Sequence, residues 1–296
     1  MIKRLLSFLA YNSRFTKKFA EHDYKSVFQR TLKDLEPLGF DIEGKRVLDL
    51  GCGKRYQFAL LCATANAHVT ALDIEYVKPD FLPYAICHTF TREGMKRAVR
   101  LGLQRLLYDR MYYSCLQNLA GKPVRAFRSK IDFIVADPEG GNYPIPPCSF
   151  ELIAANAVVE HVTNVPKFAS EICRLLVPGG YFYTTIHNFY SLSGGHRLEW
   201  AYPDEHPSSR VPPWDHLRKN MFPSMVYLNK LRPEEYKKIF SEYLDVLLFE
   251  GRDLNCNSGK FEGEHFLTAE IKVELSNFCR ELLLIRTWCM ICQKKK

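Results

Sequence analysis

The order of apolar segments in this 296-residue chain predicts an α/β fold built on a mostly parallel sheet with helices on both faces. Short apolar runs of strand length alternate with longer segments of helical period, a pattern typical of parallel sheets. Seven runs have strand character, so we expect a seven-stranded sheet. Two further segments are too long for ordinary connections, which adds a helical insertion and a lid loop to the expected fold.

The first half of the chain predicts a helical start and three strands. Residues 1–40 carry apolar positions at helical spacing and end at Gly39, so we expect an N-terminal helical segment there and the main domain over 41–296. A glycine turn after the first strand leads into a helix near 57–65. The three apolar runs of strand length are 46–50, 67–74 and 131–136.

The second half of the chain predicts four more strands with helices between them. Asn164 or Thr163 can cap a helix that has Pro166 in its first turn and stops at the Pro-Gly-Gly run 178–180. Another helix is expected over 233–240. The four remaining strands are expected at 150–155, 181–186, 243–249 and 282–292.

The two long segments differ in composition. The segment of about 76–130 is expected to be a helical insertion with a long helix over 92–119. Between Thr91 and Lys130 the chain has ten Lys and Arg and two acidic residues, a difference equal to the whole net charge of +8. A solvated helix face is the favoured interpretation, and a surface that meets phosphates is the alternative. The other segment, about 187–231, is rich in Pro, Gly, Trp, Tyr and His, and we expect it to form the lid loop.

The composition excludes several classes of protein. A chain with 47% hydrophobic and 25% charged residues is not disordered, collagen-like or a coiled coil. No apolar run approaches the roughly 20 residues of a membrane-spanning helix, and the apolar stretch 5–10 is too short for a signal peptide, so we expect a cytoplasmic location. Ten scattered cysteines indicate reduced thiols. The C-x-x-C pair of Cys289 and Cys292 has no second pair, so no metal site is expected.

The strongest chemical signal is a glycine turn directly after the first strand. Gly51 and Gly53 let the backbone turn tightly, and the following helix offers free N–H groups to an anionic group. Asp73 ends the second strand, where a carboxylate can accept both ribose hydroxyls of a nucleoside. Asp49, just before the turn, would repel a pyrophosphate but could hold an ammonium group. Taken singly, Asp49 could also cap the turn, and Asp73 could be an ordinary loop residue.

Five segments stand in the order and at the spacing of one known family: VLDLGCG (47–53), VTALDI (69–74), IVADPEG (134–140), SFELIAANAVVEHV (149–162) and EICRLLVPGGYFYTTI (171–186). With them the sequence resembles the class I S-adenosylmethionine-dependent methyltransferases, and among these the type 11 small-molecule branch. The resemblance covers roughly 45–186. It implies a Rossmann-like fold, methyltransferase activity and S-adenosyl-L-methionine as the cofactor.

Eight residues are expected to bind this cofactor: Asp49, Gly51, Cys52, Gly53, Asp73, Ile74, Asp137 and Asn156. By resemblance the glycine turn lines the methionine part, Asp73 binds the ribose and Ile74 packs on the adenine. Asp137 would face the adenine amino group, and Asn156 matches a position that often touches the cofactor. The sequence departs from the family at Arg55, where most relatives have a small residue. This puts a cation near a sulfonium ligand unless the side chain points outward.

The acceptor side is expected to use histidines and the lid loop. A hydroxyl acceptor benefits from a base with a pKa near neutrality, which histidine provides. His187, after the fifth strand, is the first catalytic candidate, and His161, after the fourth, is the second; a structural role is the alternative for each. His196, Trp200 and Trp214 are expected to bind the acceptor, the alternative being that the tryptophans anchor the loop to the core.

The favoured function is transfer of a methyl group from S-adenosylmethionine to a small-molecule acceptor, at an oxygen of a sugar or another polyhydroxylated precursor. One alternative is an RNA methyltransferase that uses the basic segment 91–130, although the base-methylation signature of such enzymes is absent after the fourth strand. The other is a non-catalytic methyltransferase-like binding protein, or a peripheral membrane adaptor without a transmembrane segment.

Overall fold

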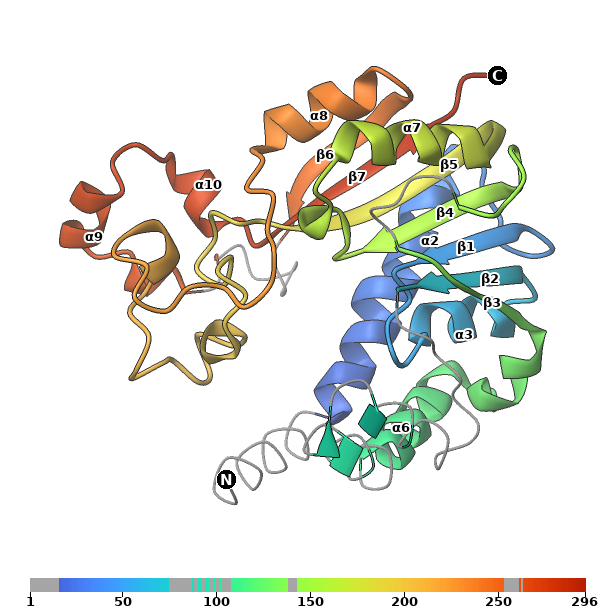
Figure 1. Cartoon of the computed structure of the whole chain (residues 1–296), viewed down its shortest axis with the longest axis horizontal. Coiled ribbons are helices and arrows are strands. Elements are labelled where there is room, and N and C mark those ends of the chain that lie inside the picture. The colour runs from blue at the N-terminus through green and yellow to red at the C-terminus, as the bar shows by residue number, and fades with distance from the viewer. Residues whose placement is uncertain are drawn as a thin grey trace. The chain divides into compact units, whose positions relative to one another are not determined.

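The computed structural model of the chain describes residues 16–74, 108–137, 143–252, 261 and 263–296, together with scattered positions between 87 and 102. The chain forms two compact units, residues 1–136 and 137–296 (Figure 1). In the part of the chain that is described, no helix is long and apolar enough to cross a membrane.

The first unit contains a helical start and three parallel strands. Its strands lie in the order β3-β2-β1, and both pairs run parallel. The helical start is a π-helical segment His22–Gln29, α2 Arg30–Leu35 and a 3-10 turn Glu36–Leu38. It ends at Gly39, whose φ of 76° is left-handed, as the sequence predicts. The remaining elements are β1 Arg46–Leu50, α3 Gln57–Thr64, β2 His68–Asp73, α6 Arg110–Ala120, the 3-10 segment Val124–Lys130 and β3 Ile131–Val135.

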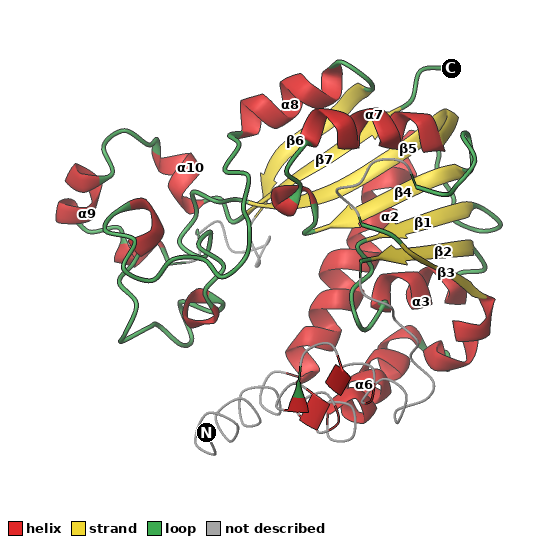
Figure 2. Cartoon of the chain, in the orientation of Figure 1, coloured by secondary structure: helices red, strands yellow, loops and turns green. Residues whose placement is uncertain are grey.

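The second unit contains four strands in the order β4-β5-β7-β6, of which β4 and β5 run parallel and the other two pairs antiparallel. Figure 2 shows α7 and α8 lying along these strands. The strands are β4 Phe150–Asn156, β5 Leu176–His187, β6 Asp245–Arg252 and β7 Thr287–Gln293. The helices are α7 Val165–Leu175, α8 Pro233–Ser241, α9 Ala269–Glu274 and α10 Arg280–Leu284. Short 3-10 turns lie at Val159–His161, Leu198–Trp200, Asp215–Leu217 and Glu264–Phe266.

Together the two units hold the seven strands of a mostly parallel, Rossmann-like sheet with helices packed against it, which confirms the predicted fold class. The predicted strand at 282–292 is wrong over its first residues, because Leu282–Leu284 belong to α10. Periodicity cannot separate a short buried helix from a buried strand when both are apolar. Of the expected helix over 92–119, α6 covers the last part, and most of 92–107 lies outside the described residues.

Helix α7 begins as its sequence predicts, but it ends at Leu175 and not at the Pro-Gly-Gly run 178–180, because β5 begins at Leu176, which pairs with Phe150 of β4. The Asn164 side chain accepts a hydrogen bond from the backbone N–H of Lys167 at 3.0 Å, and Pro166 lies in the first turn. One face buries Phe168, Ile172 and Leu175. Phe168 also meets Phe182 and Phe240 edge to face, so the helix is attached to β5 and α8 by an aromatic core.

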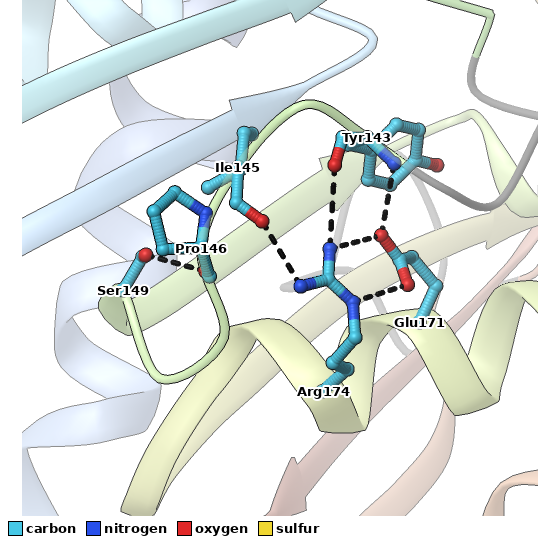
Figure 3. Close-up of polar contacts among 6 residues, drawn as sticks. All are labelled: Tyr143, Ile145, Pro146, Ser149, Glu171 and Arg174. Atoms are coloured by element: carbon cyan, nitrogen blue, oxygen red, sulfur yellow. Dashed lines mark hydrogen bonds and ion pairs between the residues drawn. The ribbon is translucent and has the colours of Figure 1, made fainter.

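The buried face of α7 also carries one charged residue, Glu171, which is matched by Arg174 (Figure 3). The guanidinium donates to both carboxylate oxygens, at 2.7 and 2.6 Å, and its Nη1 donates to the carbonyl of Ile145 at 2.9 Å. The carboxylate also accepts the backbone N–H of Tyr143 at 3.0 Å. The Arg174 side chain, through its hydrogen bonds, holds the pKa of Glu171 below its ordinary value.

We expect Arg174→Met to lower the free energy of unfolding at pH 7 by about 2 kcal/mol, because it leaves the Glu171 carboxylate buried without its partner. The pKa of Glu171 is depressed in the folded state, so this contribution is present at neutral pH and is lost as the pH falls below about 4.5. Urea unfolding at pH 7 and pH 3.5 measures both values. Arg174→Lys keeps the charge but not the paired hydrogen bonds, so its free energy of unfolding should lie between those of the wild type and Arg174→Met. An equal loss of stability at both pH values would contradict the argument.

Candidate functional site

The glycine turn lies where β1 and β2 end next to each other. Gly51 and Gly53 have φ values of 74° and 64°, in the left-handed region that glycine tolerates best. The backbone N–H groups of Gly51 and Cys52 both donate to the carbonyl of Leu72, at 2.8 and 3.1 Å. The turn is therefore fixed by the neighbouring strand before any ligand is considered.

The two predicted carboxylates both bond to this part of the chain. Asp73 Oδ2 accepts the backbone N–H of Gly53 at 2.8 Å, and Asp49 Oδ2 accepts the backbone N–H of Ala59, in the first turn of α3, at 3.0 Å. Asp49 is only 3% exposed. Burial raises the pKa of Asp49 to about 7, and the nearby Asp73 adds to the shift. Asp49 thus accepts a backbone N–H from the first turn of α3, and not from the glycine turn as the alternative interpretation expects, and it places a buried carboxylate beside that turn.

Arg55 is held by the first unit's own residues. Its Nε lies 3.4 Å from Asp109 Oδ1, and its guanidinium carbon lies 4.6 Å from the ring centroid of Tyr112. The Tyr113 hydroxyl donates to the Arg55 carbonyl at 3.0 Å. Because Asp109 matches its charge and α6 holds its side chain and backbone, the cation that departs from the family pattern is satisfied by the protein itself.

The other predicted cofactor residues differ in exposure. Cys52 is buried, and burial raises the pKa of its thiol well above the ordinary range, so it is a neutral side chain. Ile74, after β2, is 57% exposed, and Asp137 is also exposed. Asn156 ends β4 and accepts the Thr185 hydroxyl at 3.1 Å. The roles of Ile74, Asp137 and Asn156 toward a cofactor stay predictions.

Three histidines meet in the second unit, and we call His161, His187 and His196 the histidine cluster. The ring centroids of His187 and His196 are 4.5 Å apart, and those of His161 and His196 are 4.9 Å apart. His187, the last residue of β5, bonds through Nε2 to the Ser193 hydroxyl at 2.8 Å. Burial lowers the pKa of His187 well below its ordinary value and that of His196 to about 4, so both rings are neutral at physiological pH.

His161 has one fixed tautomer. Its Nδ1 lies 2.8 Å from the backbone carbonyl of Tyr227, and since a carbonyl can only accept, Nδ1 carries the proton. The lone pair is then on Nε2, which is the form in which a histidine acts as a base. The structure therefore brings His161 and His187, the two predicted catalytic histidines, into one cluster. Of the two, His161 has the hydrogen bonding that suits a general base.

Trp200 and Trp214 are buried in the core. They are 2% and 0% exposed and belong to an apolar cluster of the second unit. The other buried members are Leu192, Val211, Leu267, Ile271, Leu275, Leu283 and Leu284. This burial contradicts the expected stacking surface and favours the alternative that both rings anchor the lid loop, because a large aromatic gains most from complete burial.

Glu160, directly before His161 in the chain, is not among the site residues that the sequence predicts. The residue is 2% exposed, and its Oε1 accepts the backbone N–H of His187 at 3.2 Å, which ties the turn after β4 to the end of β5. Gly194 is equally specific, since a Cβ there would lie 2.0 Å from the carbonyl oxygen of Phe189. The Ser-Gly-Gly-His run 193–196 is the sequence feature that could have predicted this close backbone approach between Gly194 and Phe189.

Comparison with known proteins yields one family and several similar folds. A family model described as a methyltransferase domain matches residues 17–221. No curated protein matches the chain. An S-adenosylmethionine-dependent methyltransferase from Mesorhizobium loti is 16% identical with a TM-score of 0.48, over 88% of this chain and 96% of that one.

Two further solved structures are similar at the same level. The [4+2]-cyclase SpnF is 15% identical with a TM-score of 0.48, over 92% of this chain and 82% of that one. Phosphoethanolamine N-methyltransferase 2 from Haemonchus contortus, in complex with S-adenosyl-L-methionine, is 15% identical with a TM-score of 0.46, over 90% of this chain and 52% of that one.

The raised pKa of Asp49 predicts a pH-dependent stability. The folded-state pKa of about 7 lies above the ordinary 3.8, so the folded chain is stabilised by protonation, and stability falls as the pH rises from about 4 through 7. In Asp49→Asn the amide oxygen can still accept the Ala59 N–H but cannot ionise, so we expect the variant to lose this part of the pH dependence. Urea unfolding between pH 4 and pH 8 measures it, with exposed Asp132→Asn as the control; parallel curves for wild type and Asp49→Asn would refute the assignment.

Proposed function

Because the chain belongs to the methyltransferase-domain family and is an S-adenosylmethionine-dependent enzyme, we propose that it methylates an oxygen of a sugar or another polyhydroxylated small molecule. The observation that carries the cofactor half of the proposal is the Asp73 carboxylate bonded to Gly53 at the end of β2. When bound, S-adenosylmethionine supplies an electrophilic methyl group.

The residues of the first unit fit such a donor. The open side of Gly53, where a Cβ would meet nothing within 4 Å, leaves room for close approach of a ligand. The Asp73 carboxylate lies on the turn at the end of β2, where carboxylate oxygens can accept from ribose hydroxyls, and Asp49 is positioned to balance the positive charge of an amino-acid group. We propose that Gly51, Cys52 and Gly53 line the methionine portion.

On the acceptor side we propose His161 as the general base. Its Nδ1–H is fixed on the Tyr227 carbonyl, so that Nε2 can take a proton from an acceptor hydroxyl as the new bond forms. His187 has its Nε2 bonded to Ser193 and a strongly lowered pKa, which makes it the weaker base and supports a positioning role instead.

Exposed apolar residues near His161 support an acceptor that carries an apolar part. Tyr227, whose carbonyl binds His161, is about half exposed, and two apolar residues directly before it are exposed as well. They are Met225 and Val226, and Met221 is exposed on the same loop. Single exposed apolar side chains are ordinary, but a group of them on one loop marks a contact surface. A lipid-linked sugar combines hydroxyls with such a surface and is therefore the acceptor we favour within the class.

The RNA alternative receives no support from the described part of the basic segment. Arg125 and Arg128 lie over the rings of Tyr113 and Tyr56, at 5.3 and 5.4 Å from the ring centroids. Lys130 lies over Phe127 at 5.0 Å. These cations already interact with aromatic faces of the chain, which is the role of a helix-packing surface.

We expect Asp73→Ala to weaken S-adenosylmethionine binding about ten- to a hundredfold, the range set by losing hydrogen bonds to a charged group. Isothermal calorimetry with the donor and with S-adenosylhomocysteine measures the affinity. Asp73→Asn, whose amide oxygen can keep the Gly53 bond, separates loss of the turn from loss of the charge. Asp132→Ala on β3 is the matched control, and wild-type protein that binds neither ligand at millimolar concentration would overturn the cofactor proposal.

We expect His161→Gln to reduce turnover about 10²- to 10⁴-fold while donor affinity stays unchanged, because a general base acts on the acceptor and not on cofactor binding. Labelled methyl transfer to a panel of nucleotide sugars and lipid-linked sugars first identifies an acceptor, and the variant is then compared on it. His206→Gln, elsewhere on the lid loop, is the control. Unchanged turnover in His161→Gln would exclude the base, and no labelled product from the panel would exclude the acceptor class.

A further inference from the structure

Three groups that bind metals come together in the second unit from separate parts of the chain. Glu160 lies in the 3-10 turn after β4, His187 ends β5, and His196 follows the Ser-Gly-Gly turn of the lid loop. One ligand-type atom from each lies within 4.8 Å of the others. Among the described residues, this is the group of three His, Cys, Asp or Glu side chains whose ligand atoms lie close enough together to bind one metal ion.

Two atoms of this group are buried without a hydrogen-bond partner in the described structure: Glu160 Oε2 and His196 Nε2. Glu160 is 2% exposed, so its second carboxylate oxygen has no access to solvent. A buried polar atom that is left unpaired costs free energy, and a buried carboxylate costs more.

The backbone around His196 is arranged to keep its ring in this place. A Cβ at Gly194 would collide with the Phe189 carbonyl, and one at Gly195 would lie 3.0 Å from the His216 ring. His216 Nε2 donates to the same Phe189 carbonyl at 2.8 Å, which holds that side of the turn. His196 itself has a φ of 52°, a conformation that is unfavourable for a residue with a Cβ. Strain held by surrounding packing at buried polar groups is typical of functional sites.

We propose that Glu160, His187 and His196 bind one divalent transition-metal cation, with Zn²⁺ as the best match to the donor set. Two imidazoles and one carboxylate form the ligand set of zinc sites that keep a fourth position open. The two imidazole rings lie 4.5 Å apart between centroids, and a cation would supply a positive charge next to the buried, unpaired Glu160 Oε2. The Ser193 hydroxyl holds the His187 ring, as outer-shell hydrogen bonds do for metal-bound imidazoles.

This site goes beyond the proposed methyl transfer and does not depend on it. A bound cation would join the turn after β4, the end of β5 and the lid loop through one centre, and its open position would accept a ligand oxygen. His161 is not one of the three ligands, and its Nδ1 is bonded to the Tyr227 carbonyl. Metal binding and donor binding can therefore be measured separately on the same protein.

The experiment uses the full chain, dialysed against a chelator and then titrated with Zn²⁺ by calorimetry and with Co²⁺ by visible absorption. We expect one equivalent per chain and the intense ligand-field bands of a low-symmetry Co²⁺ site. Glu160→Gln keeps an oxygen for the His187 N–H, and His196→Asn tolerates the left-handed φ, so both are chosen to preserve the fold. Each should weaken Zn²⁺ binding at least about a hundredfold, whereas His265→Asn, an exposed histidine of the same unit, should not.

The wild-type titration alone can overturn the proposal. No stoichiometric uptake of Zn²⁺ or Co²⁺ by the chelator-treated wild type would do so, even if neither variant folds. Uptake that both folded variants retain would also do so, because the cation would then be bound elsewhere. Donor binding by S-adenosylmethionine, measured on the same samples, shows whether a failure concerns the metal site or the proposed function.

Discussion

The parallel pairing of β1 with β2 is the constraint on which the cofactor side of the first unit depends. It puts Leu50 opposite Leu72, so that the chain leaves both strands at the same edge. The Leu72 carbonyl then receives two N–H groups of the turn, and the next residue, Asp73, receives the third at Gly53. The neighbouring strand therefore satisfies three backbone N–H groups of the turn and fixes its shape.

Much of this could be predicted from the sequence because the determinants are local. A buried strand, a Gly-x-Gly turn and a strand-end carboxylate each occupy a few consecutive residues, and parallel register brings them together without further information. The bounds of β1 were predicted residue for residue, and α7 follows its cap and its proline. The prediction failed where one apolar run contained two elements, as at α10, since period alone does not separate them.

The second site could be predicted only in part, because its geometry is made by contacts distant in sequence. Glu160 and His187 are joined by a backbone bond between the ends of two strands, and His196 reaches them through a turn that depends on Gly194. The sequence identified the histidines, but it could not predict which ring is buried or which atoms each ring bonds to. It also assigned Trp200 to a ligand, whereas the core formed by α9, α10 and the lid loop takes that ring for itself. A segment rich in aromatic residues can stack these rings on a ligand or pack them into the protein core, and its composition does not distinguish the two.

Some of the non-glycine residues with a left-handed backbone lie beside the two sites. In the first unit Tyr56, directly after the glycine turn, has a φ of 37°; in the second, Ala157 after β4 and His196 have φ values of 55° and 52°. Such conformations persist only where the surroundings over-determine them. Tyr56 packs against Phe133, edge to face at 5.1 Å between ring centroids, whereas the His196 ring lies against His161 and His187 and its Nε2 is buried without a hydrogen-bond partner. The backbone strain at Tyr56 is thus offset by packing within the fold. At His196 the strain accompanies a buried nitrogen that the described residues leave without a hydrogen bond, which is consistent with the proposed bound cation.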